Sequence, residues 1–187
     1  MKPPFLSLLL ALSGPRPAAP PVPGVPTGGV GTGYDGTNMK DFWEYDPASN
    51  IWTQKADFPG TARSQAVGFN SDTKGYVGTG WDGRYRLKDF YQYDPAANTW
   101  APIAEFGGPA RRSAVAMSIN NKGYVGTGDS VAYFKDFWEY APSITINTWS
   151  LKTTFEGNAR FGAVGFSIVS FMHSSFMSRI HLELGDW

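Results

Sequence analysis

The sequence predicts an all-β fold built from repeated four-stranded units, and three observations support this prediction. One phrase recurs three times, as KDFWEYDP at 40–47, KDFYQYDP at 88–95 and KDFWEYAP at 135–142. The steps from Asp41 to Asp89 and from Asp89 to Asp136 are 48 and 47 residues, a period typical of repeat architectures. The chain has 22 glycines and 16% aromatic residues, which suits short strands and tight turns. No segment between residues 28 and 166 has a helical hydrophobic period.

The first two predicted strands of each copy are rich in small residues. The first follows an arginine and is a short apolar run, at 63–69, 111–117 and 160–166. Small side chains suit a strand that is packed closely on both faces. The second is GYVGTG at 75–80 and 123–128, and a degenerate copy, GGVGTG, stands at 28–33. Glycines inside a strand indicate close approach of another backbone or a bulge.

The third and fourth predicted strands carry the large aromatic residues. In the third, Phe42 and Glu44 alternate with Trp43 and Tyr45, the period of a strand, and Asp-Pro then begins a turn. The fourth contains a tryptophan, Trp52, Trp100 or Trp149, and each lies 11 residues before the next arginine. Four short strands bounded by turn residues are typical of a β-propeller blade.

The order of these segments resembles the kelch repeat. It is most similar to the exported bacterial kelch proteins that are related to the propeller of galactose oxidase. The resemblance covers residues 28–168, although Gly-Thr-Gly replaces the paired glycines of that family. It implies that each blade runs from an inner strand at a central channel to an outer edge strand. The array then begins at a second strand and ends just after a first strand, 161–168, which is the phase that propellers use for ring closure.

Three blades are fewer than the four to eight that a propeller typically has. Beyond Ile168 the repeat fails, and the tail 169–187 matches nothing upstream. The predicted fold is therefore a partial propeller of about three four-stranded blades, a truncated or incomplete ring. A gene fragment gives this pattern. The alternative is a half-propeller that self-associates through its open blade edges and closes as a dimer of six blades.

The N-terminus resembles a secretion signal. Lys2 precedes the apolar run 5–12, and Ala11 and Ser13 fit a signal-peptidase site, so residues 1–13 are predicted to be a signal peptide. This predicts a secreted, periplasmic or cell-surface protein. A wrongly assigned start or a disordered leader is the alternative. Residues 14–27 are proline-rich and predict an extended linker. The apolar run is too short to span a bilayer, so no membrane insertion is expected.

Charge and cysteine content exclude several functions. The net charge is zero, so no basic field indicates nucleic-acid binding. The absence of cysteine excludes disulfides, a thiol nucleophile and a cysteine-ligated metal. It also excludes a copper site of the galactose oxidase type, which the resemblance would otherwise suggest. His173 and His181 have no metal-ligand spacing, and no phosphate loop or nucleophile elbow is present. No cofactor is expected.

The residues that recur in every copy are expected to be structural. The three tryptophans and the aspartates Asp41, Asp89 and Asp136 occupy identical settings, which indicates core packing and turn contacts rather than sugar stacking or catalysis. The repeated arginines leave two interpretations open. The resemblance implies ligand contact near the channel mouth, while the alternative is that they tie adjacent blades together. These candidates are Arg63, Arg111 and Arg160, with Arg112 as a neighbour unique to its copy.

Binding is expected where the copies differ, because loops on a rigid scaffold usually carry it. The loops between the second and third strands are 34–38, 81–86 and 129–134. The middle loop contains the side-chain types that dominate binding hot spots. The candidates are Trp81, Arg84, Tyr85 and Arg86, with Tyr133 in the third loop. The alternative is a merely solvated loop.

These observations favour a non-enzymatic binding or scaffold module that binds protein or carbohydrate through its inter-strand loops. One alternative is a fragment of a kelch-type sugar-modifying enzyme, an epimerase or mutarotase, that lacks the blades completing its site. Another is a fragment with no stable function. A propeller fold hosts many functions, so the sequence does not name the ligand.

Overall fold

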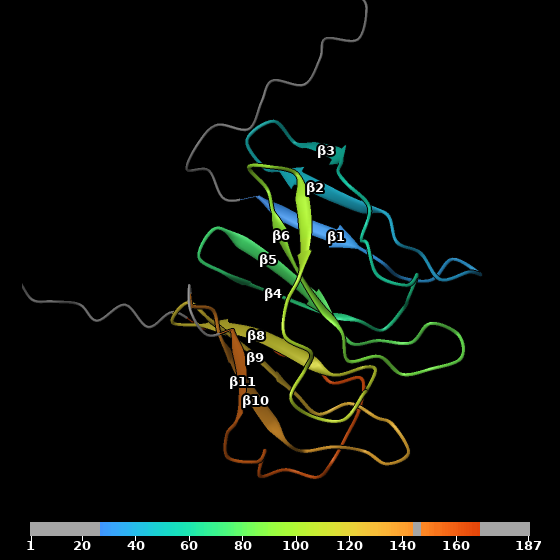
Figure 1. Cartoon of the computed structure of the whole chain (residues 1–187), viewed down its shortest axis with the longest axis vertical. Coiled ribbons are helices and arrows are strands. Elements are labelled where there is room, and N and C mark those ends of the chain that lie inside the picture. Colours follow the sequence, from blue (N-terminus) through green and yellow to red (C-terminus); the bar gives the residue numbers. More distant parts are fainter. Residues whose placement is uncertain (1–26, 144–146, 169–187) are drawn as a thin grey trace, which may run out of the picture.

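The computed structural model describes residues 27–143 and 147–168. In these residues the chain forms eleven strands and no helix, arranged in three antiparallel sheets. The first sheet has the order β1-β2-β3, the second β4-β5-β6-β7 and the third β8-β9-β10-β11. Figure 1 shows them along the long axis, with β1–β3 at one end, β10 and β11 at the other and the second sheet between them. This is a partial propeller of about three blades, as the repeat predicts.

Each blade follows the predicted order of strands. The first sheet contains β1 (Gly28–Gly31), β2 (Phe42–Asp46) and β3 (Ile51–Gln54). The second contains β4 (Val67–Ser71), β5 (Lys74–Gly78), β6 (Phe90–Asp94) and β7 (Thr99–Pro102). The third contains β8 (Val115–Ile119), β9 (Lys122–Gly126), β10 (Phe137–Ala141) and β11 (Thr148–Leu151). Among the described residues, the first sheet therefore has no counterpart of the inner strand that the other two possess.

The register explains why glycine ends the second strand. Gly78 lies opposite Phe90, and Gly126 lies opposite Phe137. A Cβ atom added to Gly78 would lie 2.3 Å from the Phe90 ring, far inside van der Waals contact. The repeated phenylalanine thus packs directly on the glycine backbone, as close approach of two strands requires. Phe90 is almost fully buried as a result.

The turns between the third and fourth strands use the predicted Asp-Pro chemistry. The carboxylate of Asp46 accepts from the Ala48 N–H at 2.9 Å, and that of Asp94 accepts from the Ala96 N–H at 3.0 Å. Asn98 then adopts the left-handed conformation, with φ of 51°, and its side-chain oxygen accepts from the Tyr93 hydroxyl. Such turns favour Asx residues because their short side chains bond the local backbone.

The hydrophobic core lies between the second and third blades. Trp149 of β11 is buried and packs on Phe90, Phe106 and Tyr140. Its indole N–H donates to Ala104 O, just as the Trp100 indole donates to Ala56 O. Each of these tryptophans therefore bonds the backbone of the connection that precedes its blade. The core cluster comprises Val67, Phe69, Tyr76, Phe90, Phe106, Val125, Tyr140 and Trp149.

Two expectations about the ends of the array differ from the structure. Trp52 is 50% exposed rather than part of a blade-to-blade core, because no blade precedes it in the described residues. Residues 161–168, predicted as an inner strand, belong to no strand, although 163–168 run beside β8. There the Gly162 N–H donates to Ser113 O, and the Ser167 hydroxyl donates to Ser118 O. They hold the position of an inner strand, but the described residues include no second strand of the same blade with which they could pair.

The predicted signal peptide, residues 14–26 of the proline-rich segment and the tail 169–187 lie outside the described residues. Within the described part of the chain, nothing qualifies as an apolar helix of membrane-spanning length.

Candidate functional site

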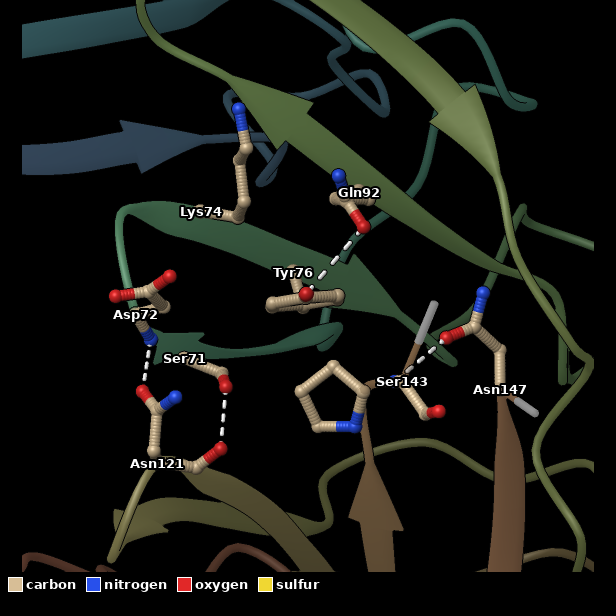
Figure 2. A pocket seen from close by; sticks show the side chains of 9 residues that line it. Ser71, Asp72, Lys74, Tyr76, Gln92, Asn121, Ser143 and Asn147 are labelled. Carbon is tan, nitrogen blue, oxygen red and sulfur yellow. Dashed lines mark hydrogen bonds between the residues drawn. The ribbon is translucent and has the colours of Figure 1, made fainter. Parts of the chain in front are cut away.

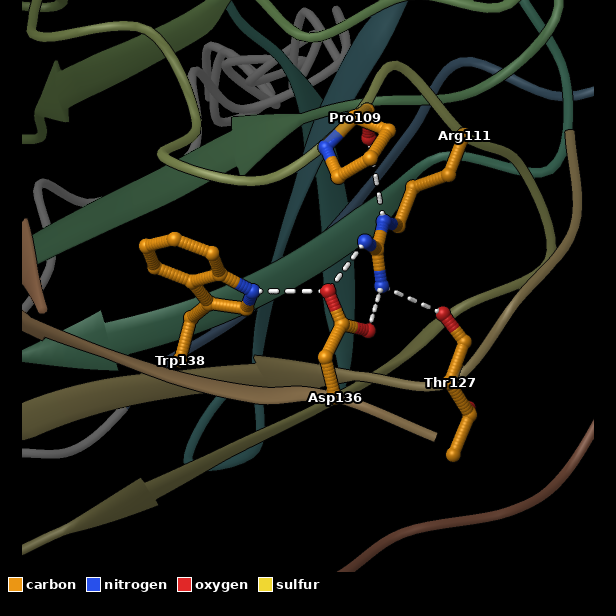
Figure 3. A network of polar contacts seen from close by, with 5 residues as sticks. All are labelled: Pro109, Arg111, Thr127, Asp136 and Trp138. Carbon is orange, nitrogen blue, oxygen red and sulfur yellow. Dashed lines mark hydrogen bonds and ion pairs between the residues drawn. The ribbon is translucent and has the colours of Figure 1, made fainter. Parts of the chain in front are cut away.

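Two of the three repeated arginines, Arg63 and Arg111, are buried beside the loops that join the second and third strands. Arg111 is fully buried, and its guanidinium forms two bonds to the Asp136 carboxylate, both at 2.6 Å. The same group donates to Thr127 O at 2.8 Å and to Pro109 O at 3.2 Å (Figure 3). Burial by itself would raise the pKa of Asp136, but the bonds from Arg111 and Trp138 outweigh it and hold this pKa below its usual value.

The second blade repeats this arrangement. Arg63 is also fully buried and bonds the two Asp89 oxygens at 2.6 and 2.7 Å. It donates to Thr79 O and Thr61 O, and its guanidinium lies 4.7 Å from the Phe58 ring. A guanidinium with this many protein partners has few donors left for a ligand. The geometry therefore supports the structural interpretation of Arg63 and Arg111, not ligand contact.

The backbone of each arginine joins one blade to the next. The Arg63 N–H donates to Met39 O, and Gly33 N–H donates to Arg63 O, at 3.0 and 2.9 Å. Arg111 makes the same two bonds with Leu87 and Gly80, one blade further along. The side chain thus holds together the strands of its own blade, while the backbone is bound to the preceding blade.

Arg160 differs from its two counterparts because it is exposed. Its guanidinium donates to Asn158 O at 3.0 Å and lies 4.8 Å from the Phe155 ring, as in the other copies. No carboxylate of the described residues forms an ion pair with it. The blade to which its aspartate would belong has no described second or third strand.

The loops between second and third strands form three small hairpins at the same end of the blades. Each is closed by one pair of residues: Tyr34 with Asn38, Trp81 with Arg86, and Asp129 with Tyr133. The first residue of a hairpin also pairs with the residue after a repeated arginine, as Trp81 does with Ser64 and Asp129 with Arg112. The scaffold therefore fixes these positions, while their side chains change from copy to copy.

Four of these side chains form one cluster, which we name the Trp81 cluster: Trp81, Arg86, Arg112 and Asp129. The guanidiniums of Arg86 and Arg112 lie 5.3 and 5.2 Å from the Trp81 ring, within cation–π range. Both also pair with the buried carboxylate of Asp129 at 3.2 Å. Two positive charges share one negative charge, so the cluster has a net charge of plus one beside an aromatic ring.

The tip of the middle hairpin adds two exposed side chains to this surface. Asp82 accepts from the backbone N–H groups of Tyr85 and Arg84 at 2.5 and 2.7 Å, and these bonds lower the pKa of its carboxyl. The Arg84 guanidinium lies 4.9 Å from the Tyr85 ring. The turn is therefore held by Asp82, while Arg84 and Tyr85 face solvent.

Tyr133 of the third hairpin is not part of the Trp81 cluster. It stacks on Phe161 with ring centroids 5.1 Å apart, and both rings are about half exposed. Tyr133 and Phe161 occupy the positions that Arg86 and Arg112 occupy one blade earlier. The same scaffold positions thus present two guanidiniums in one place and two aromatic rings in the next.

Asp129 and Phe161 were not among the candidates predicted from the sequence. Asp129 stands in phase with Tyr34 and Trp81, where a carboxylate breaks the aromatic pattern of the other copies. Phe161 stands in phase with Ser64 and Arg112. Aligning the first residue of each hairpin and the residue after each repeated arginine would have identified both, since these positions change in chemistry among the copies.

A cleft of about 260 Å³ lies at the other end of the strands, between the tight turns of the second and third blades. Figure 2 shows Tyr76, Gln92 and Asn121 in its wall. The Tyr76 hydroxyl donates to Gln92, while Ser71 and the Asp72 N–H donate to Asn121. The two bonds to Asn121 connect the turns of adjacent blades, whereas the Tyr76–Gln92 bond lies within the second blade. None of the predicted binding residues lines this cleft.

Within the described residues, no group of three or more His, Cys, Asp or Glu side chains is placed to hold a metal ion.

Comparison with known proteins places the fold but not the activity. No family model matches the chain, and no curated protein matches it. Among solved structures, the structure of YjhT, a kelch-type protein, matches with a TM-score of 0.58 and 15% sequence identity. The match covers 68% of this chain and 42% of YjhT, so the chain spans less than half of that structure. At this identity the likeness supports a kelch-like propeller fold alone.

Proposed function

We propose that the chain is a non-enzymatic binding module of the kelch-like propeller type, which binds a protein or carbohydrate ligand on its hairpin face. The Trp81 cluster is the observation that carries this proposal. It combines an aromatic ring with two guanidiniums, each about 30% exposed at its side chain. Aromatic rings stack on sugars and apolar groups, and arginine forks bind carboxylates.

The surroundings of the cluster support a ligand larger than a single ion. Arg84 and Tyr85 extend the surface on the same hairpin, and the Tyr133–Phe161 pair lies on the next hairpin along the array. Tyrosine, tryptophan and arginine are the side chains that most often dominate binding energy at interfaces. We therefore propose that an acidic group of the ligand binds the guanidiniums while its apolar part contacts the aromatic rings.

Binding measured on glycan arrays and in pull-downs tests the proposal. The variants Trp81→Ala and Tyr85→Ala are expected to lose about tenfold or more in affinity each, as hot-spot truncations do. Trp52→Ala is the matched control, because Trp52 is an exposed tryptophan on the outer strand of the first blade. Retention of full binding by both loop variants would remove this surface as the site.

A second candidate function is a kelch-type sugar-modifying enzyme whose site is completed by further blades. The match covers only 42% of YjhT, so that structure contains further parts that have no counterpart in the match. This second function requires additional acidic and arginine side chains at the same face. A turnover assay on a version of the protein that contains further blades, with Asp129→Asn and Arg112→Ala as variants, distinguishes it from binding alone.

We also propose, from the signal-like N-terminus, that the protein is exported. Detection of the mature chain outside the cytoplasm, with a new N-terminus after Ser13, is the expected result. Retention of Met1 on the purified protein would contradict it.

A further inference from the structure

Each of the two complete blades contains a two-point ion pair between an arginine and an aspartate. In each, a fully buried arginine that precedes the inner strand makes two bonds to the aspartate that precedes the third strand. The inner strand also pairs with the second strand in a fixed register, with Val67 opposite Gly78 and Val115 opposite Gly126. An inner strand and its arginine therefore act as one unit that completes a blade.

We call the inner strand with its arginine the donating half of a blade, and the second strand with the aspartate the receiving half. In the described residues, the first blade has a receiving half but no donating half. Asp41 accepts from the Trp43 indole at 2.7 Å, as Asp136 does from Trp138, but no arginine of the described residues pairs with it. Its sheet ends at β1, which corresponds to the second strand of the other blades. One edge of β1 is therefore unpaired in the described chain.

The last described segment has the donating half without the receiving half. Arg160 is exposed and has no carboxylate partner among the described residues, although its contacts with Asn158 and Phe155 repeat those of the buried arginines. Residues 163–168, AVGFSI, match AVGFNS at 66–71 and AVAMSI at 114–119. They lie in the inner-strand position, and Val164 and Phe166 are 91% and 73% exposed.

We propose that a second copy of this chain joins the two halves. Residues 163–168 of each copy pair with β1 of the other, and Arg160 binds the partner's Asp41 through both carboxylate oxygens. The register follows from the complete blades, in which the residue four positions after the arginine lies opposite the last glycine of the second strand. It places Val164 opposite the partner's Gly31, Gly165 opposite Val30 and Phe166 opposite Gly29.

The position of the two halves explains why the partner is another copy. The first sheet and the last sheet lie at opposite ends of the array, with a complete blade between them (Figure 1). A twofold pair brings each donating end to a receiving end, so that both junctions form at once. The pair then has six blades, within the four to eight that close a ring. Both the edge of β1 and that of residues 163–168 are then paired.

The mass of the full chain in solution, measured by analytical ultracentrifugation, tests the proposal. We expect a particle of twice the chain mass. Arg160→Ala and Asp41→Asn are each expected to raise the dimer Kd by at least about 30-fold, because truncating one partner of a buried charge pair removes that much affinity. Arg84→Ala, an exposed arginine outside both halves, is the control and is expected to leave the Kd unchanged.

A synthetic peptide of residues 158–168 provides a second measurement that does not depend on a variant folding. It carries the donating half alone, so it is expected to bind the chain at β1 and to dissociate the dimer. The same peptide with Arg160→Ala is expected to bind at least about 30-fold more weakly.

Three results would overturn the proposal. The first is a monomer at all concentrations together with no binding of the peptide. The second is a dimer whose Kd neither Arg160→Ala nor Asp41→Asn changes, which would indicate another interface. The third is a loss of stability in Asp186→Asn, but no effect of Asp41→Asn. Asp186 lies 26 residues after Arg160, the same separation as Asp89 after Arg63, and this result would identify a carboxylate in the same chain as the partner.

Discussion

The guanidinium of Arg111 and the carboxylate of Asp136 form a two-point ion pair in which one member is fully buried and the other is about 20% exposed. Twenty-five residues separate them in the sequence, and two strands of one blade lie between them. The pair Arg63–Asp89 repeats it one blade earlier. This contact therefore belongs to the scaffold and recurs with the repeat.

Removing the arginine of this pair should destabilise the fold. Arg111→Ala leaves Asp136 and the Thr127 carbonyl without their partner, and we expect the free energy of unfolding to fall by about 3–5 kcal/mol. Arg111→Lys should recover only part of this, because an ammonium group cannot bond both carboxylate oxygens in the planar fork geometry. Urea denaturation followed by tryptophan fluorescence measures both. Arg84→Ala is the control, and a loss below about 1 kcal/mol for Arg111→Ala would contradict a stabilising pair.

The two tryptophans at the ends of the described array should differ in their contribution to stability. Trp149 is 9% exposed and packs on four aromatic rings of the core, whereas Trp52 is 50% exposed. Trp149→Ala is expected to cost about 3–5 kcal/mol of unfolding free energy, as other buried tryptophans do. Trp52→Ala should cost much less, and equal losses in thermal unfolding would contradict the arrangement of the blades.

Acid should weaken the third blade through Glu139. The Tyr124 hydroxyl bonds this carboxylate at 2.7 Å, with Lys122 and Lys152 each at 3.1 Å, and these contacts lower its pKa from 4.5 to about 2. Because the pKa is lower in the folded state, the stabilisation is complete above about pH 4.5 and is lost as the pH falls towards 2.

Glu139→Gln tests this contribution, and the chain already uses the same residue type at Gln92, where the amide accepts from Tyr76. The variant should be less stable than the natural chain at pH 7 and should approach it in stability near pH 2. Denaturation curves at a series of pH values give the comparison. A constant difference across this range would show that Glu139 does not titrate as described.

The glycines that follow the second strand should differ in sensitivity although their motif is the same. Gly80 has φ of 104°, and a Cβ atom there would lie 2.7 Å from Ser64 O. Gly33 has φ of 118°, but no atom lies near the corresponding position. Gly33→Ala is therefore expected to cost only the backbone strain, about 1–2 kcal/mol, and Gly80→Ala distinctly more. Thermal unfolding of both variants measures the difference, and a ranking in the opposite order would be inconsistent with the packing of the inner strands.

Much of the fold could be predicted from the repeat because each strand carries its own local signal. Glycines end the second strand, an alternating aromatic phrase forms the third, and Asp-Pro turns follow it in the first two copies. The strand at 161–168 was not confirmed. Its sequence has the correct pattern, but a strand requires a neighbour for its backbone groups, and the described chain supplies none on its open side.

The binding site was only partly predictable. Trp81, Arg86 and Arg112 could be identified as positions that differ between copies, and the structure brings these three together. Asp129 joins them from the next hairpin through its contact with Arg86, 43 residues away in the sequence, which no local pattern encodes. Arg63 and Arg111 had two open interpretations, and only their burial and their bonds to Asp89 and Asp136 distinguish between these.

The sequence by itself determined the period, the order of strands and the phase in which the array begins and ends, since these depend on local residue patterns. The tertiary structure decided which of the repeated residues are buried and which are exposed. Trp52 and Trp149 have matching sequence contexts and yet differ in burial, and so do Arg160 and Arg111. The reason is that a side chain in a blade is buried by the neighbouring strands and blades. Position within the array therefore decides what each copy of the same motif does.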